Sequence, residues 1–95
     1  MISNHVNSRH RATLATVFDD PIRASIRWAD IEAMLSAPGG LGAEITEGRG
    51  SRVRVHLRGV RAVFHRPHPR KEASRGAVKS VRRFLAEAGI GPTGE

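Results

Sequence analysis

Three apolar positions near the N-terminus fall at helical spacing. They share one side of a helix predicted over residues 9–18, and they are Leu14, Val17 and Phe18. Ser8 stands directly before this segment, where a serine side chain can accept a hydrogen bond from the first turn, so we expect it to be the N-cap. Pro21 ends the helix, because a proline disfavours helical backbone in the residue before it.

A second helical pattern covers residues 28–35. Its apolar positions are three or four residues apart, at Trp28, Ile31, Met34 and Leu35. Pro38 and the two glycines after it end this helix and open a loop. The first half of the chain is therefore predicted to hold two short amphipathic helices.

From residue 43 onward the period of the pattern changes to two. Residues 43–47 predict a short strand, and a glycine-rich turn follows it. Residues 52–58 alternate strictly, which is typical of a strand buried on one side. One face holds Val53, Val55 and Leu57, and the other holds Arg52, Arg54, His56 and Arg58. A third strand is predicted over residues 60–65, where Val60, Ala62 and Phe64 compete with Val63 for the core.

The C-terminal part returns to helical spacing. A helix is predicted over residues 75–88, with its apolar side formed by Val78, Val81, Phe84, Leu85 and Ala88. Gly89 can end it in the left-handed conformation, with Ile90 packing back beneath the last turn.

The order of elements predicts an α+β fold with a three-stranded antiparallel sheet and helices on one sheet face. One domain over residues 8–90 is expected, with residues 1–7 and 91–95 as disordered tails. The other sheet face then displays Arg52, Arg54, His56 and Arg58.

Composition narrows the function classes. The 95 residues contain no cysteine, which excludes disulfides and thiolate metal sites. No apolar segment approaches the length of a membrane span, and the N-terminus lacks the apolar core of a signal peptide. We therefore expect a cytoplasmic protein without a membrane partner.

The basic residues are concentrated in one third of the chain. Residues 49–83 hold ten Arg and two Lys against a single acid, Glu72, whereas acids outnumber bases on either side of that segment. Solubility requires charged residues at the surface, but it does not require that charges of one sign be confined to one segment. A polyanionic partner accounts for this distribution, and nucleic acid is the commonest polyanion.

Several motifs, in order, resemble the HicA family of toxins from type II toxin–antitoxin pairs. These are the helix over residues 28–35, the turn Gly50-Ser51, the segment His68-Pro69-Arg70-Lys71-Glu72 and the closing helix that ends at Ile90. The resemblance covers residues 28–90. It implies a double-stranded-RNA-binding-like α-β-β-β-α fold, to which the helix at residues 9–18 is an addition. It also implies a ribosome-independent mRNA endoribonuclease that needs no cofactor and is neutralised by a HicB-like antitoxin covering the active face.

The sequence departs from the family at one chemically important position. The catalytic histidine of the family directly follows the Gly-Ser turn, and Arg52 stands there instead. Arginine stays protonated, so it can stabilise phosphate charge but cannot exchange a proton. Two alternatives remain open: a ribonuclease that uses another histidine, and a non-catalytic RNA-binding module on the same fold. A ribosome- or nucleoid-associated protein is a third, weaker alternative.

Metal-free RNA cleavage needs one group to take the 2′-hydroxyl proton, another to protonate the leaving oxygen, and positive charge for the phosphorane. Histidine suits both proton transfers near neutral pH. The candidates for catalysis are His56, His65 and His68, with Arg52 as a phosphate clamp. Two histidines at this spacing with no cysteine do not predict a metal site. The residues predicted to bind RNA are Arg49, Ser51, Arg52, Arg54, Arg58, Arg66, Arg70, Lys71, Arg75 and Lys79. The oligomeric state stays open.

Overall fold

The computed structural model describes residues 6–94 and shows an α+β fold, as predicted. The elements in chain order are α1 (Ser8–Val17), α2 (Trp28–Ser36), β1 (Glu44–Glu47), β2 (Arg52–Leu57), β3 (Val60–His65) and α3 (Arg75–Glu87). The strands form one antiparallel sheet in the order β1-β2-β3. Every predicted helix and strand is confirmed to within two residues at each end.

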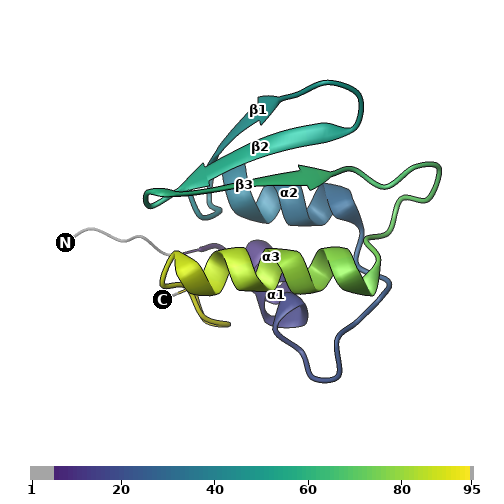
Figure 1. Cartoon of the computed structure of the whole chain (residues 1–95). Helices are drawn as coiled ribbons and strands as arrows, with labels where there is room; N and C mark the ends of the chain where they lie inside the picture. Colours follow the sequence, from purple (N-terminus) through teal and green to yellow (C-terminus); the bar gives the residue numbers. More distant parts are fainter. Residues whose placement is uncertain (1–5, 95) are drawn as a thin grey trace.

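All three helices lie on the same side of the sheet (Figure 1). α2 contacts β1 and α3 contacts β3, so these two helices form the layer next to the strands. α1 packs against α2 and α3 instead. One face of the sheet is therefore covered by helices, and the other is open.

The register of the sheet resolves the ambiguity in the third strand. Val53 pairs with Phe64, and Val55 pairs with Ala62. Because paired residues in an antiparallel sheet point to the same face, β3 turns Phe64 and Ala62 toward the helices. Val63 consequently lies on the open face, where it is 52% exposed.

An aromatic cluster joins the helices to the sheet. The ring of Phe64 from β3 lies 5.9 Å from that of Trp28 and 5.7 Å from that of Phe84, measured between centroids. Trp28 belongs to α2 and Phe84 to α3, so the three rings connect three elements. Aromatic pairs at these separations contribute roughly 0.5–1.5 kcal/mol each beyond their buried area.

The tight turn between β2 and β3 differs from the prediction at Arg58. Leu57 pairs with Val60, so the turn contains only Arg58 and Gly59, with φ values of 52° and 81°. Two consecutive residues with positive φ form the type of two-residue turn that matches the twist of a hairpin. Arg58 is thus a turn residue and not the last residue of the strand.

The helix ends follow local capping rules. Asn7, rather than the predicted Ser8, caps α1, because its side chain accepts a hydrogen bond from the backbone N–H of His10. Gly89 ends α3 at φ 79°, and the N–H of Ile90 donates to the carbonyl of Leu85 at 2.9 Å. This is the predicted glycine cap, with the chain folding back beneath the helix.

The folded part extends slightly beyond the predicted domain. Val6 is buried, and the N–H of Asn7 donates to the carbonyl of Gly39, so neither belongs to a disordered tail. At the other end, the N–H of Gly94 donates to the carbonyl of Gly91 in a turn. The rest of the predicted tails, residues 1–5 and 95, lies outside the described residues.

α1 extends the hydrophobic core. Leu14 and Val17 are fully buried, so they pack inside the domain and are not available as a dimer contact. From α3, the Arg82 guanidinium donates to the carbonyls of Val17 and Asp19 and lies 5.8 Å from the centre of the Phe18 ring. Carbonyls at the C-terminal end of α1 thereby gain partners that the helix itself cannot supply. Among residues 6–94, no helix has the length and apolarity needed to cross a membrane.

Candidate nucleic-acid interface and active site

The open face of the sheet is basic because alternation in β2 and β3 places their polar residues on the same side. Three cross-strand rows make up this outer face. They are Glu44–His56–Arg61, Thr46–Arg54–Val63 and Arg52–His65. Three guanidinium groups and two imidazoles therefore share the face with a single carboxylate. Within residues 6–94, no helix covers it (Figure 1).

Arg52 and His65 form the row nearest the turn between β1 and β2. Directly opposite residues of an antiparallel pair have their Cβ atoms about 4.5–5.5 Å apart, so the two side chains are neighbours. The Nδ1 atom of His65 lies 3.5 Å from the hydroxyl oxygen of Ser51. An imidazole therefore stands beside the Arg52 guanidinium, on the next strand.

A groove begins at His65 and runs along the N-terminal end of α3. Its volume is about 640 Å³. Its polar lining includes His65, His68, Arg70, Glu72, Ser74 and Arg75. Ser74 caps α3 by accepting a hydrogen bond from the N–H of Ala77 at 3.1 Å. The positive end of the helix dipole and the basic side chains all favour an anion in this groove.

The loop that forms one wall of the groove is anchored to the start of α2. The N–H of Trp28 donates to the carbonyl of Lys71, and the N–H of Ala73 donates to the carbonyl of Ile26. These backbone bonds hold residues 66–74 against the helical layer, although the segment has no regular structure of its own. His68 and Arg70 are therefore carried by a fixed loop.

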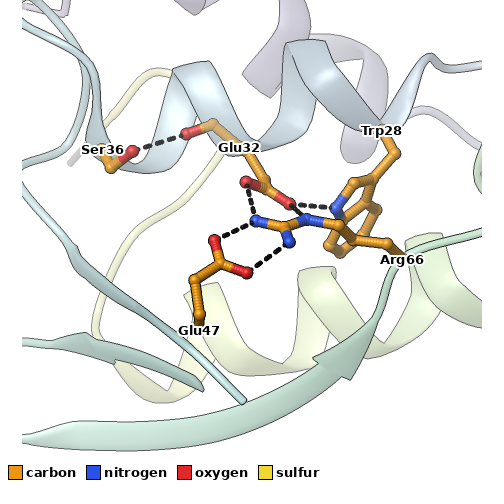
Figure 2. A network of polar contacts seen from close by, with 5 residues as sticks. All are labelled: Trp28, Glu32, Ser36, Glu47 and Arg66. Atoms are coloured by element: carbon orange, nitrogen blue, oxygen red, sulfur yellow. Dashed lines mark hydrogen bonds and ion pairs between the residues drawn. The ribbon is translucent and has the colours of Figure 1, made fainter. Parts of the chain in front are cut away.

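Arg66 is placed differently from the prediction that it binds RNA. Its guanidinium donates to both oxygens of Glu32 at 2.7 and 3.1 Å and to both oxygens of Glu47 at 2.7 and 2.8 Å. Trp28 Nε1 donates to the same Glu32 carboxylate (Figure 2). With both carboxylates bound in this fork geometry, Arg66 joins β1, α2 and the loop and is not free to take a phosphate.

The contact between Arg66 and the carboxylates shifts the pKa of Glu47 and of Arg66 itself. The hydrogen bonds from Arg66 lower the pKa of Glu47 below its ordinary value, despite some desolvation in the opposite direction. In turn, the hydrogen bonds to Glu47 and Glu32 raise the pKa of Arg66. Glu47 and Arg66 therefore both stay charged at neutral pH. Because the N–H of Arg66 also donates to the carbonyl of Ser51 at 2.8 Å, the contact fixes the turn that presents Arg52.

The structure brings together some of the predicted site residues and separates others. Arg52, Ser51, His65, His68, Arg70 and Arg75 surround the junction of outer face and groove. His56 lies further along the outer face, with its Nδ1 atom 3.5 Å from Glu44 Oε1. Arg49 and Arg58 occupy turns at opposite ends of β2, and Lys79 is exposed on α3 one turn beyond Arg75. Their roles in RNA binding stay predictions.

Two outer-face residues, Arg61 and Val63, were not identified from the sequence as parts of the site. Their orientation depends on the register of β3, which the pattern of that strand left open. The alternation of Val60, Ala62 and Phe64, taken with the pairing to Val53 and Val55, is the signal that identifies them. Among the described residues, no group of three His, Cys, Asp or Glu side chains is arranged to hold a metal ion.

Comparison with family models finds a match over residues 28–90 to the HicA toxin of bacterial toxin–antitoxin systems. The matched range contains α2, the three strands and α3, which gives the α-β-β-β-α order expected for that family, and α1 precedes it. No curated protein and no solved structure matches the chain. The match covers about two thirds of the 95 residues and agrees with the element order, so this chain belongs to the HicA toxin family.

Proposed function

We propose that this toxin binds mRNA and cleaves it as a metal-independent endoribonuclease in the cytoplasm. The observation that carries the proposal is the position of His65. It faces Arg52 across the β2–β3 ladder, and it also lines the groove that contains His68. A proton acceptor, a proton donor and a fixed positive charge therefore surround one site, which is what cleavage through a 2′-hydroxyl requires.

The reaction can be assigned to these residues. Neutral His65 takes the proton of the ribose 2′-hydroxyl, and the 2′-oxygen attacks the adjacent phosphorus. Arg52 stabilises the negative charge that develops on the phosphorane oxygens, because its guanidinium stays protonated throughout. As the bond from phosphorus to the 5′-oxygen breaks, protonated His68 gives its proton to that oxygen. The products are a 2′,3′-cyclic phosphate and a free 5′-hydroxyl.

The outer face and the groove supply the binding surface for the RNA backbone. Arg54 and Arg61 extend the positive charge along the sheet, and Arg70 and Arg75 extend it along the groove. Arginine contacts phosphate bidentately, which holds a strand in register as well as attracting it. The RNA then crosses the sheet and passes His65 into the groove.

The experiment is a cleavage assay on a labelled RNA with purified protein and a chelator present. We expect His65→Ala and His68→Ala to lower the cleavage rate at least about 100-fold, because each removes a proton-transfer group. His56→Ala is the matched control: it removes the same side chain from the same sheet, but from a position outside the groove. It should lower the cleavage rate far less than either groove variant, because it leaves both proton-transfer groups in place.

Two results would contradict this assignment. If only His56→Ala abolished cleavage, the active site would lie at the other end of the outer face. If the wild type bound RNA tightly but left it intact, the protein would be a non-catalytic RNA-binding module, the alternative favoured by Arg52 at the histidine position. A substrate with 2′-deoxyribose at the scissile position should resist cleavage, because the attacking oxygen is missing.

A further inference from the structure

A second hollow lies on the outer face, separate from the groove at α3. Its volume is about 580 Å³, within the range of roughly 300–1,000 Å³ typical of small-ligand sites. It is lined by Glu44, Thr46, Arg54, Val55, His56, Arg61, Ala62 and Val63. None of these residues lines the groove that contains His65 and His68.

The floor of the hollow offers an apolar surface between charged groups. Val63 is the one large hydrophobic side chain that is exposed among residues 6–94, and Arg54 is its cross-strand partner. A single exposed valine has no significance by itself. Here it lies beside Arg54 on β2 and two residues from Arg61 on its own strand, so the hollow can contact both the face and the edges of a flat, polar ring.

The charged groups of the hollow match one nucleobase better than the others. Arg54 and Arg61 are donors, and a guanidinium pairs bidentately with the O6 and N7 acceptors of guanine. Glu44 supplies the acceptor, because its carboxylate is 82% exposed and lies 3.5 Å from the His56 ring. Guanine presents two adjacent donors, at N1 and N2, to such a carboxylate, whereas adenine and cytosine present a single amino group there.

We propose that this hollow binds one unpaired guanine of a single-stranded RNA and thereby directs where the strand is cleaved. The inference rests on the proposed function, since it takes RNA as the ligand. The base must be unpaired, because in an A-form duplex the O6 and N7 atoms of guanine lie in a deep, narrow major groove that side chains cannot read, and N1 is used in base pairing. Of the two rows that line the hollow, the one with Arg54 and Val63 lies two residues from the Arg52–His65 row, about 7 Å along the strand, and the one with Glu44 and Arg61 lies four residues from it, about 13 Å. A base in the hollow therefore belongs to a nucleotide one or two positions from the one cleaved at His65.

The test measures binding of 2′-O-methyl hexamers, which cannot be cleaved through the 2′-oxygen. The four hexamers are identical stretches of uridine except at the third position, which is G, A, C or U. The hexamer with G is also tested as a duplex with its complementary strand. We expect the G hexamer to bind at least about fivefold more tightly than the other three and than the duplex, as one good base contact allows. Glu44→Ala should abolish the preference for G, while Glu87→Ala, which removes an exposed acid from α3, should keep it.

Two further variants separate apolar contact from charged contact. Val63→Ala should weaken binding of all single strands about threefold, with no change in the salt dependence, because it removes only apolar contact. Arg54→Ala removes both a donor to the guanine and a positive charge, so it should reduce the preference for G and make the slope of log K against log salt shallower by about one. Arg83→Ala, the loss of an exposed arginine on α3, is the control for net charge and should leave the preference for G intact.

Several outcomes would overturn the inference. One is equal binding of the four hexamers, and another is a duplex that binds as tightly as the single strand. A third is normal RNA binding by Glu44→Ala and Val63→Ala together with weakened binding of the antitoxin, which would make the hollow a protein contact. In each of these cases RNA still binds and can be cleaved, so the proposed function survives. If the wild type bound no RNA at all, the proposed function itself would fail.

Discussion

Arg66 shows how one residue can set the geometry of the site without taking part in it. Its guanidinium donates four hydrogen bonds to two carboxylates that come from α2 and β1. Lysine could not replace it, because an ammonium group lacks the planar fork that matches two carboxylates at once. The backbone of the same residue holds Ser51, so the turn before Arg52 is fixed to the helical layer through Arg66.

The ion contact at Glu47 predicts a specific dependence of stability on pH. Its pKa in the folded protein lies below the ordinary value of 4.5, so the folded state binds its proton less readily than the unfolded state. The stabilisation is therefore complete above about pH 5.5 and is lost as the pH falls through the folded pKa. We expect the difference in unfolding free energy between wild type and Glu47→Gln to be constant above pH 6 and to shrink below pH 4.5.

Urea denaturation at a series of pH values measures this difference. Glu87→Gln provides the control, since Glu87 is exposed on α3 and has no basic partner among the ion pairs of the described residues. Its effect on stability should not vary across the same pH range. A Glu47→Gln effect that stayed constant down to pH 3 would show that the contact with Arg66 does not stabilise the fold.

The sequence suggested histidines as candidates for the site, but it could not identify the partners of Arg66. Glu32 and Glu47 lie 34 and 19 residues from it along the chain, and no local pattern relates them. The same limit applies to Arg52 and His65, which become neighbours only through the β2–β3 register. Residue types predict which chemistry is available, but which groups meet depends on tertiary contacts.

At the scale of elements, the helices and strands were predictable because each has its own apolar period. α3 was predicted almost completely, since its apolar stripe and its glycine stop agree, and the structure adds Ser74 as its N-cap. The cap of α1 was misplaced by one residue because Asn7 and Ser8 are both strong caps, and the choice depends on the contact of Asn7 with Gly39. The role of α1 also required the structure, since its apolar side could equally have formed a dimer contact.

Leu14 tests whether α1 is an integral part of the domain. Its side chain is fully buried in the core that α1 shares with α2 and α3. Leu14→Ala should lower the unfolding free energy by about 2–4 kcal/mol, because it removes buried apolar atoms and leaves a cavity. Thr13→Ala, a neighbouring change on the more exposed side of α1, should cost less than about 1 kcal/mol.

Denaturant unfolding of the two variants gives the comparison. The slope of unfolding free energy against urea should be the same for Leu14→Ala and the wild type, since both unfold as one cooperative unit. If Leu14→Ala were as stable as Thr13→Ala, α1 would be an attachment to the domain that residues 28–90 form without it.

At the scale of the molecule, the topology turns a basic segment into a basic surface. Residues 49–83 contain β2, β3, the loop before α3 and most of α3. The alternation of the two strands sends their arginines to the open face, and the loop and α3 continue the charge into the groove. Acidic side chains of the first half, such as Glu32 and Glu47, lie on the helical side, where they hold Arg66. The basic side chains are therefore concentrated on the open face of the sheet and in the groove.

The same charge distribution predicts how a HicB-like antitoxin would neutralise this toxin. A protein that covers the outer face must offset Arg52, Arg54 and Arg61, so we expect an acidic contact surface and an association rate that falls as salt increases.

Expression of the toxin alone should arrest growth, and co-expression of the product of the neighbouring gene should restore it. With purified proteins, Arg54→Ala combined with Arg61→Ala should slow association with the antitoxin, whereas Arg83→Ala should not. Growth that continues when the toxin is expressed alone would contradict the proposed activity. If the antitoxin restored growth but bound the Arg54→Ala, Arg61→Ala variant as fast as the wild type, it would bind another surface. It would then act without covering the RNA site.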